Sequence, residues 1–231
     1  WDTSRVTSMK GTFKGCSTFN QDISRWDVSK LTTMESAFEE CTSFNQDLSG
    51  WNTVSLTNLS HTFAGCSSFN SSLNNWNVNQ VTQLDRTFAG ATSFNQPLSN
   101  WNVGMAYTLR ECFAGAVNFN QDISAWNVER VEDMQYTFAG ASSFNQDLSV
   151  WDTASLLNLE GTFKDAVLFN SDLSLWNTSQ AVTLSSTFQG ATSFNQPLND
   201  WNVANVSTMQ STFAGAVAFN QPLNNWDVSN V

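Results

Sequence analysis

The stretch WNVERVEDMQYTFAGASSFNQDLSV at residues 126–150 is one unit of a repeat that runs through the whole 231-residue chain. All 18 phenylalanines fall at positions 13 and 19 of such units, counted from the tryptophan, and position 20 is Asn in every full unit. A fixed period of this length is typical of solenoids, whose units are too small to bury their own apolar face and therefore stack. The tryptophans mark the period of 25 residues: Trp1, Trp26, Trp51, Trp76, Trp101, Trp126, Trp151, Trp176, Trp201 and Trp226.

Each unit is predicted to form one coil with one short parallel strand and one short helical turn. Ile23, Trp26 and Val28 have the spacing of the leucine-rich-repeat strand, and residues two apart share one face of a strand. Met34 and Phe38 follow with the i, i+4 spacing of a helix. The expected fold class is therefore a leucine-rich-repeat-like β-solenoid. It forms a single domain over residues 1–231, with nine full repeats, a partial tenth and no visible caps.

The constant columns of the repeat are predicted to be structural. Tryptophan is expected to point inward, because it is in phase with the Val or Thr two residues later. The Asn at position 20 is expected to satisfy backbone groups at a corner, and the Asp or Asn at position 2 to bond the backbone in a second ladder. Position 15 is usually Gly and should end the helical turn, although Glu40 and Asp165 break that rule.

Composition limits the classes of partner. The net charge is −11 and no run of Lys or Arg occurs, which excludes nucleic acids and anionic membrane surfaces as partners. No apolar stretch approaches the roughly 20 residues that span a bilayer, so no direct membrane insertion is expected. Any targeting or capping segment is expected outside residues 1–231.

The sequence predicts no catalytic residue, no metal site and no cofactor. Position 22 is often Asp, but Pro97 and two other prolines take the same slot, so a regular calcium column is not expected; both residues suit a turn. Cys16, Cys41 and Cys66 share a small apolar slot and are expected to be buried free thiols. His61 is expected to face outward without a partner. Because no nucleophile, base and orienting group gather outside the repeat, the chain is not expected to be an enzyme.

The strongest departures from the repeat lie at position 25. This usually polar position is apolar in three consecutive units, at Ala125, Val150 and Leu175, and Leu157 and Leu168 are apolar at other polar positions. Contiguous exposed apolar surface often marks an interaction site, so these five residues form the candidate interaction strip. Coverage by a neighbouring segment, or drift, is the alternative. Alanine replacement of Val150 and Leu175 is predicted to leave folding intact and to weaken association.

Two further surface features are weighed. Sequons at Asn58, Asn177 and Asn205 would permit N-glycosylation in a eukaryotic secretory route, whereas a fourth, at Asn70, falls in the position 20 column and is expected to be unavailable. A threonine column that includes Thr62 suggests ice or other surface binding. Other residues interrupt that column, which argues against a regular lattice-matching face.

The stretch FNQPLNNWDVSNV at residues 219–231, together with Met209, Phe213, Gly215 and Ala216, resembles the BspA-like leucine-rich-repeat surface proteins. The resemblance covers the whole chain. It implies a secreted or cell-surface solenoid, and it brings no catalytic or ligand residues with it.

Two function classes follow from this reading. One is a non-catalytic extracellular or cell-surface protein that mediates adhesion or recognition of a protein or glycan through its strand face. The other is a structural building block of an extracellular filament or appendage, assembled from copies of itself by coil stacking or lateral packing.

Overall fold

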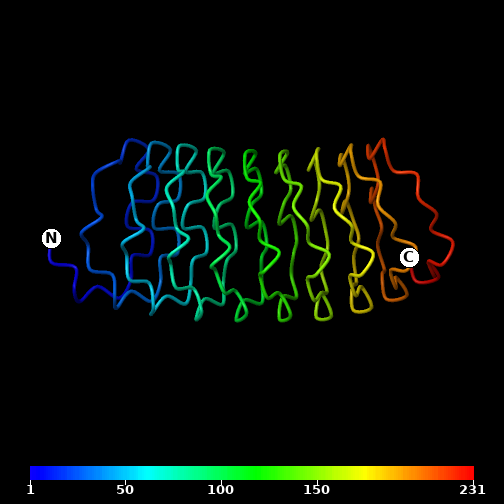
Figure 1. The fold of residues 1–231 in the computed structure, drawn as a ribbon, viewed down its shortest axis with the longest axis horizontal. Coiled ribbons are helices and arrows are strands. Elements are labelled where there is room, and N and C mark those ends of the chain that lie inside the picture. Colours follow the sequence, from blue (N-terminus) through cyan, green and yellow to red (C-terminus); the bar gives the residue numbers. More distant parts are fainter.

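The computed structural model describes residues 1–231, which wind into a row of similar coils from one end of the molecule to the other (Figure 1). Each 25-residue unit forms one coil, so that coil 1 is residues 1–25 and coil 9 is residues 201–225, followed by residues 226–231. The chain has no α-helix and no extended strand. Its only bridges are eight isolated parallel ones between position 8 of neighbouring coils, from Ser8–Thr33 to Thr183–Thr208. Consequently no helix is present that could cross a membrane.

Neighbouring coils are joined by a backbone ladder along positions 8–15. In coil 3 the N–H groups of His61, Phe63 and Gly65 donate to carbonyls of coil 4 at 2.7, 2.9 and 2.7 Å. The intervening N–H groups stay within the coil, as in the 3.1 Å bond from Thr62 to the Leu59 carbonyl. Every second peptide therefore points along the row. We call the outward side chains at positions 8, 10, 11, 14 and 15 the ladder face.

Backbone conformation explains why this segment is not helical. Position 11 has a φ between 51° and 62° in all nine coils, and position 15 has a φ between 55° and 76°. Glu40 and Asp165, which replace the usual glycine of position 15, adopt the same left-handed conformation at 62° and 55°. A left-handed residue interrupts a right-handed helix and turns the next N–H outward, toward the following coil. The i, i+4 spacing of Met34 and Phe38 therefore places both side chains inward without forming a helical turn.

The segment around each tryptophan differs from the expected strand as well. It makes no bridge to its neighbours, and turns lie at positions 4–5 and 24–25. The Asp27 carboxylate accepts the N–H of Ser29 at 2.9 Å, and the Asp22 carboxylate accepts the N–H of Ser24 at 2.9 Å. The Asp or Asn of position 2 thus bonds the backbone, as predicted. The bond lies within its own coil, and no ladder between coils is formed at this position. Asp favours such turns because its short side chain reaches the backbone two residues later.

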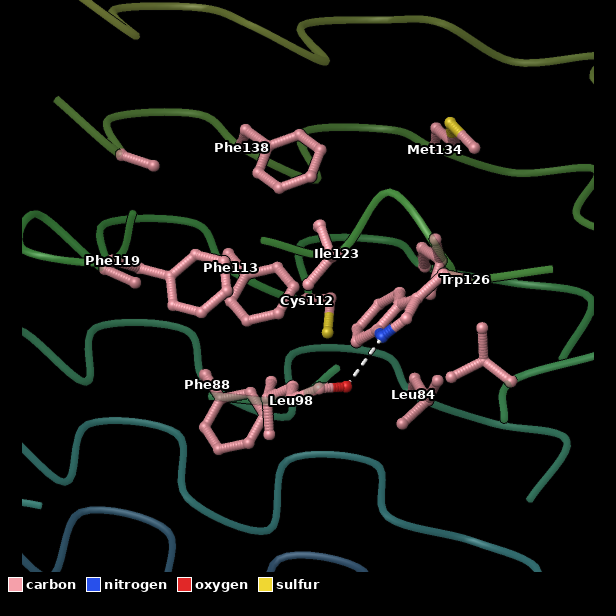
Figure 2. Packing of buried hydrophobic residues seen from close by; sticks show 14 of the residues in the cluster. Leu84, Phe88, Leu98, Cys112, Phe113, Phe119, Ile123, Trp126, Met134 and Phe138 are labelled. Carbon is pink, nitrogen blue, oxygen red and sulfur yellow. Dashed lines mark hydrogen bonds between the residues drawn. The ribbon is translucent and has the colours of Figure 1, made fainter. Parts of the chain in front are cut away.

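The interior is a set of aromatic columns (Figure 2). Phe113 and Phe119 stack within their coil at a ring separation of 4.1 Å, and Phe113 also stacks on Phe138 of the next coil at 5.7 Å. The Trp126 indole N–H donates to the carbonyl of Leu98, 28 residues earlier in the chain, at 3.1 Å. The inward orientation predicted for tryptophan is confirmed for all seven from Trp51 to Trp201. Burial of each ring removes about 150–250 Å² from water, which makes these columns the main source of stability.

The asparagine column at position 20 bonds coil to coil, as predicted. The Asn120 side-chain oxygen accepts the backbone N–H of Asn145 at 2.9 Å and the Gln146 side-chain amide at 2.8 Å. The same backbone bond recurs in every neighbouring pair of coils, from Asn20 and Asn45 to Asn195 and Asn220. This column fixes the corner opposite the tryptophan turns.

The threonine column at position 12 lies inside the molecule rather than on its surface. Thr62, Thr87 and Thr137 are fully buried, and the Thr62 hydroxyl lies 2.7 Å from the Leu59 carbonyl oxygen. The threonine column is therefore no ice-binding or other contact face, and that hypothesis was wrong. Its hydroxyls point inward and bond carbonyls of position 9, which also accept the backbone N–H of the threonine in the same coil.

The cysteine column follows its prediction in part. All four cysteines are free; Cys41 and Cys66 are buried as predicted, and Cys16 is exposed in coil 1. Burial raises the pKa of the Cys41 thiol to about 11. Burial raises the pKa values of the Cys66 and Cys112 thiols as well, so these three buried thiols are protonated at neutral pH.

Candidate functional site

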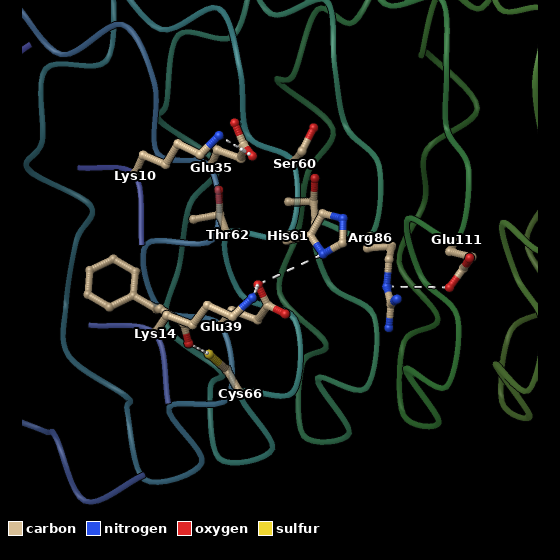
Figure 3. Close-up of polar contacts among 12 residues, drawn as sticks. Lys10, Lys14, Glu35, Glu39, Ser60, His61, Thr62, Cys66, Arg86 and Glu111 are labelled. Carbon is tan, nitrogen blue, oxygen red and sulfur yellow. Dashed lines mark hydrogen bonds and ion pairs between the residues drawn. The ribbon is translucent and has the colours of Figure 1, made fainter. Parts of the chain in front are cut away.

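Charged side chains gather on the ladder face of coils 1–7 (Figure 3). The ladder face of coils 8 and 9 carries neutral side chains instead, among them Thr183, Ser185, Ser186 and Thr208. The charged members are Lys10, Lys14, Glu35, Glu39, Glu40, Asp85, Arg86, Arg110, Glu111, Asp133, Glu160, Lys164 and Asp165. The face is therefore chemically uneven along a backbone that is the same in every coil.

Most carboxylates elsewhere on the surface accept hydrogen bonds from backbone N–H groups within turns. Asp47 and Asp147 each accept the N–H of the residue two further on, at 2.9 Å in both cases. The Ser149 hydroxyl, followed by its N–H, holds the pKa of the Asp147 carboxyl below its ordinary value. These acids are engaged by their own turns, whereas the charged side chains of the ladder face contact one another across neighbouring coils.

A polar hollow of about 530 Å³ lies on this face across coils 2–5. No hydrophobic side chain lines it, and its volume falls in the range of small-molecule sites. We call it the ladder-face hollow. Its walls are Glu35, Asn58, Ser60, His61, Gln83, Asp85, Arg86, Arg110 and Glu111.

Most charges of the hollow are paired, whereas the Asp85 carboxylate makes no ion pair. Glu35 lies 2.8 Å from the Lys10 ammonium. Glu111 lies between two guanidinium groups, with its oxygens 3.4 Å from Arg86 Nε and 3.7 Å from Arg110 Nε. The contacts of both guanidiniums with Glu111 are ion pairs without a well-aligned hydrogen bond. Both arginine side chains are about half exposed, at 47% and 50%. Their remaining N–H groups face solvent.

His61 has a partner, contrary to the sequence prediction. Its Nδ1 lies 4.0 Å from Glu39 Oε2, and the Lys14 ammonium lies 2.9 Å from the same oxygen (Figure 3). Burial alone would raise the pKa of the Glu39 carboxyl, but hydrogen bonds from Lys14 and Ser36 and the Lys14 charge outweigh it and lower that pKa. The sequence does not reveal this group of three side chains, because its members come from three different coils and are 22 to 25 residues apart.

Both tyrosines of the chain border the ladder. Gln83, a wall of the hollow, donates from its amide to the Tyr107 hydroxyl at 3.2 Å, and Tyr107 is 46% exposed. Tyr136 donates to Glu160 at 2.8 Å and covers Gly161, where any side chain would collide with its ring. All phenylalanines, and all tryptophans except the exposed Trp1, belong to the core or pack against it, so these two tyrosine rings are the aromatic groups this face offers to a partner.

The polar side chains that line the hollow are hydrogen-bonding groups. No group of three His, Cys, Asp or Glu side chains is placed to hold a metal ion. The hollow contains one hydroxyl, that of Ser60, and no hydrogen bond joins it to His61. What the hollow presents is a dense set of hydrogen-bond donors and acceptors.

The predicted interaction strip lies elsewhere and is exposed. Val150 is 70% and Leu175 79% exposed, in the turn at positions 24–25, and Ala125 lies in the same column. Leu157 is 38% exposed beside the ladder, and Leu168 is 53% exposed in the turn at positions 17–18. The five residues thus occupy three columns, of which only the position 25 column runs through consecutive coils.

The sequons differ in access. Asn177 and Asn205 are exposed, whereas Asn58 is half-buried in the hollow and its side-chain oxygen accepts the Ser60 N–H at 2.7 Å. Asn205 donates to the Ser179 carbonyl at 2.7 Å. Asn70 accepts the Asn95 N–H at 2.9 Å within the corner column, as expected.

The sequence reading did not find the hollow, although a signal was present. Positions 10 and 11 are among the variable columns and hold Asp85, Arg86, Arg110 and Glu111 on two neighbouring coils. Because these positions were predicted to lie in a helical turn, where charged side chains are ordinarily solvated, their variation did not predict a site.

Comparison with known proteins places the chain in a family without assigning it an activity. No curated protein matches it. One family matches three overlapping stretches, residues 1–101, 57–167 and 147–231, each of which spans several of the 25-residue units. Since these stretches together cover the whole chain, it is a repeat protein that belongs to the family described as "Mycoplasma protein of unknown function, DUF285".

Proposed function

We propose that the chain is a non-catalytic recognition module of a cell surface or of the extracellular space, and that it binds a protein or glycan through the ladder face of coils 2–6. The observation that carries this proposal is the concentration of charged and tyrosine side chains on one face of an otherwise uniform stack. Extended surfaces of repeat proteins commonly serve as binding sites, and Tyr and Arg are enriched among the residues that dominate binding energy.

The scaffold supports this proposal because it holds the face in a fixed shape. Backbone bonds tie each coil to the next along positions 8–15, and the phenylalanine columns pack directly beneath. Arg86, Arg110 and Tyr107 therefore project from a rigid base. Side chains ordered before binding lose less entropy when a partner arrives.

The fold class and the location belong to the same proposal. The resemblance to the BspA-like surface proteins favours a leucine-rich-repeat-like solenoid that is secreted or displayed on a cell. The free thiols do not conflict with this, because those of Cys41, Cys66 and Cys112 are buried.

The test compares two regions of one face. Labelled chain is applied to epithelial cell layers and to immobilised glycans, and a Tyr107→Ala, Arg110→Ala variant is compared with a matched Ser185→Ala, Thr208→Ala variant from coils 8 and 9. We expect the first variant to lose most of the bound signal and the second to bind like the parent, with circular dichroism confirming both folds. Equal binding by the parent and the Tyr107, Arg110 variant would exclude the ladder face.

A structural building block is the second candidate, and the exposed Val150 and Leu175 side chains favour it. If copies of the chain pack laterally, Val150→Ala, Leu175→Ala should lower the sedimentation-derived mass at high protein concentration while leaving folding intact. An unchanged mass distribution would remove this column as an association surface.

A further inference from the structure

The ladder-face hollow combines paired charges with unused hydrogen-bonding capacity. Glu111 is shared by Arg86 and Arg110 through their Nε atoms, which leaves the outer N–H groups of both guanidiniums free. The Asp85 carboxylate accepts the Thr108 hydroxyl at 2.7 Å and has capacity for further donors. A ligand therefore meets donors and acceptors side by side.

The balance of charge selects among ligands. Glu35 is neutralised by Lys10, and Glu111 by the two arginines. An anionic ligand would compete with Glu111 for the guanidiniums, and a cationic ligand would compete with the arginines for the same carboxylate. An uncharged ligand with neighbouring hydroxyls avoids this competition, because one hydroxyl can donate to a carboxylate while the next accepts from a guanidinium.

The rest of the hollow has matching chemistry. The amides of Asn58 and Gln83 and the hydroxyl of Ser60 each offer both donor and acceptor groups. Tyr107 stands at the edge, held by the Gln83 amide at 3.2 Å, and supplies the aromatic face that the lining itself lacks. The volume of about 530 Å³ accommodates one or two hexose rings.

From this geometry we infer that the ladder-face hollow is a binding site for a neutral, hydroxyl-rich sugar unit, with neighbouring hydroxyls placed between the Arg86 and Arg110 guanidiniums and the Asp85 and Glu111 carboxylates. The inference deepens the proposed function, on which it rests, by naming the class of ligand. Contacts to a single sugar ring are few, so the free ring binds in the millimolar range, at about −4 kcal/mol, and avidity arises from several units of a glycan.

The experiment is an NMR titration of isotope-labelled chain with the methyl glycosides of glucose, galactose and mannose. We expect at least one of them to shift the side-chain signals of Asn58, Gln83 and Arg86 saturably. Methyl glucuronide and glucosamine, the charged counterparts, should bind roughly 5-fold to 10-fold more weakly because each disturbs the shared Glu111 pairing.

Matched variants separate the sugar site from general effects. Arg86→Lys keeps the charge but loses the planar fork, and should weaken the neutral sugar roughly 10-fold. Lys164→Ala removes a charge from the same face outside the hollow and should leave binding unchanged. The inference is overturned if no neutral glycoside causes saturable shifts in folded protein, if a charged sugar binds more tightly, or if Arg86→Lys binds like the parent.

Failure of the sugar site can be distinguished from failure of the proposed function. Loss of cell-surface binding in the Tyr107, Arg110 variant together with no sugar binding leaves the recognition module in place and overturns the sugar site. Undiminished surface binding in that variant overturns the ladder face as a whole.

Discussion

The ladder face of coils 3–6 and that of coils 8–9 share one backbone and differ most in the side chains at positions 10 and 11. In the first region Asp85, Arg86 and Arg110 surround a polar hollow; in the second, Ser185 and Thr208 lie 2.9 Å apart and no charge is present. Their positive φ values at position 11 and their interior phenylalanines are the same. The difference shows that the repeat fixes the backbone of every coil, whereas the outward side chains at positions 10 and 11 change from coil to coil.

The interior should respond alike in both regions. Phe138→Ala in coil 6 and Phe188→Ala in coil 8 each remove a ring stacked on three neighbours, so each should lower the free energy of unfolding by about 3–5 kcal/mol. Urea unfolding followed by tryptophan fluorescence measures both. If the loss of unfolding free energy in one variant were less than half that in the other, the outer charges would contribute to the stability of the scaffold.

The corner column should have the next largest effect. Asn120→Ala removes the acceptor of the Asn145 N–H and of the Gln146 amide, and should cost about 1–3 kcal/mol. Asn195→Ala in coil 8 removes the equivalent acceptor of Asn220 and serves as the counterpart. Hydrogen exchange of the Asn145 and Asn220 amides is the measurement, and unaltered protection in either variant would contradict the role given to that column.

The residue at position 11 differs between the two regions. Ser186, with a φ of 57°, makes no side-chain hydrogen bond, so Ser186→Gly should relieve left-handed strain and stabilise the chain by about 1 kcal/mol. Tyr136→Gly relieves the same strain but loses the bond to Glu160 at 2.8 Å, so no stabilisation is expected. Urea midpoints compare the two. Equal gains would mean that Tyr136 contributes nothing through its contacts.

Acidification should weaken the turns that Asp caps. The Ser124 and Ser149 groups lower the pKa values of Asp122 and Asp147, so both acids favour the folded state above the pKa of the unfolded chain. That stability is lost as pH falls below about 4 and through the lower folded values. Coils 4, 8 and 9 carry Pro97, Pro197 and Pro222 at this position.

Asp122→Pro with Asp147→Pro should therefore reduce the fall in thermal midpoint between about pH 5 and pH 2.5. An identical pH profile for parent and variant would show that these caps do not contribute to acid sensitivity.

The sequence by itself determined the period, the inward tryptophans and phenylalanines, the asparagine corner and the capping role of position 22. Each of these depends on residue type at a fixed spacing, which recurrence in every unit makes visible. It did not determine the path of the backbone. The same i, i+4 spacing suits a helical turn or alternating left-handed residues, and only contact with the next coil selects the latter by pairing the N–H groups of positions 9, 11, 13 and 15.

The ladder-face hollow was likewise decided by tertiary structure alone. Glu35, His61, Arg86 and Glu111 are each about one coil apart in sequence, and they meet because stacking places equivalent positions within a few ångströms. Burial of Thr62 rather than its display had the same cause, since a neighbouring coil supplies the carbonyl at 3.0 Å that its hydroxyl bonds. A repeat therefore specifies its columns one by one, whereas the meeting of different columns on one surface follows only from how the coils are stacked.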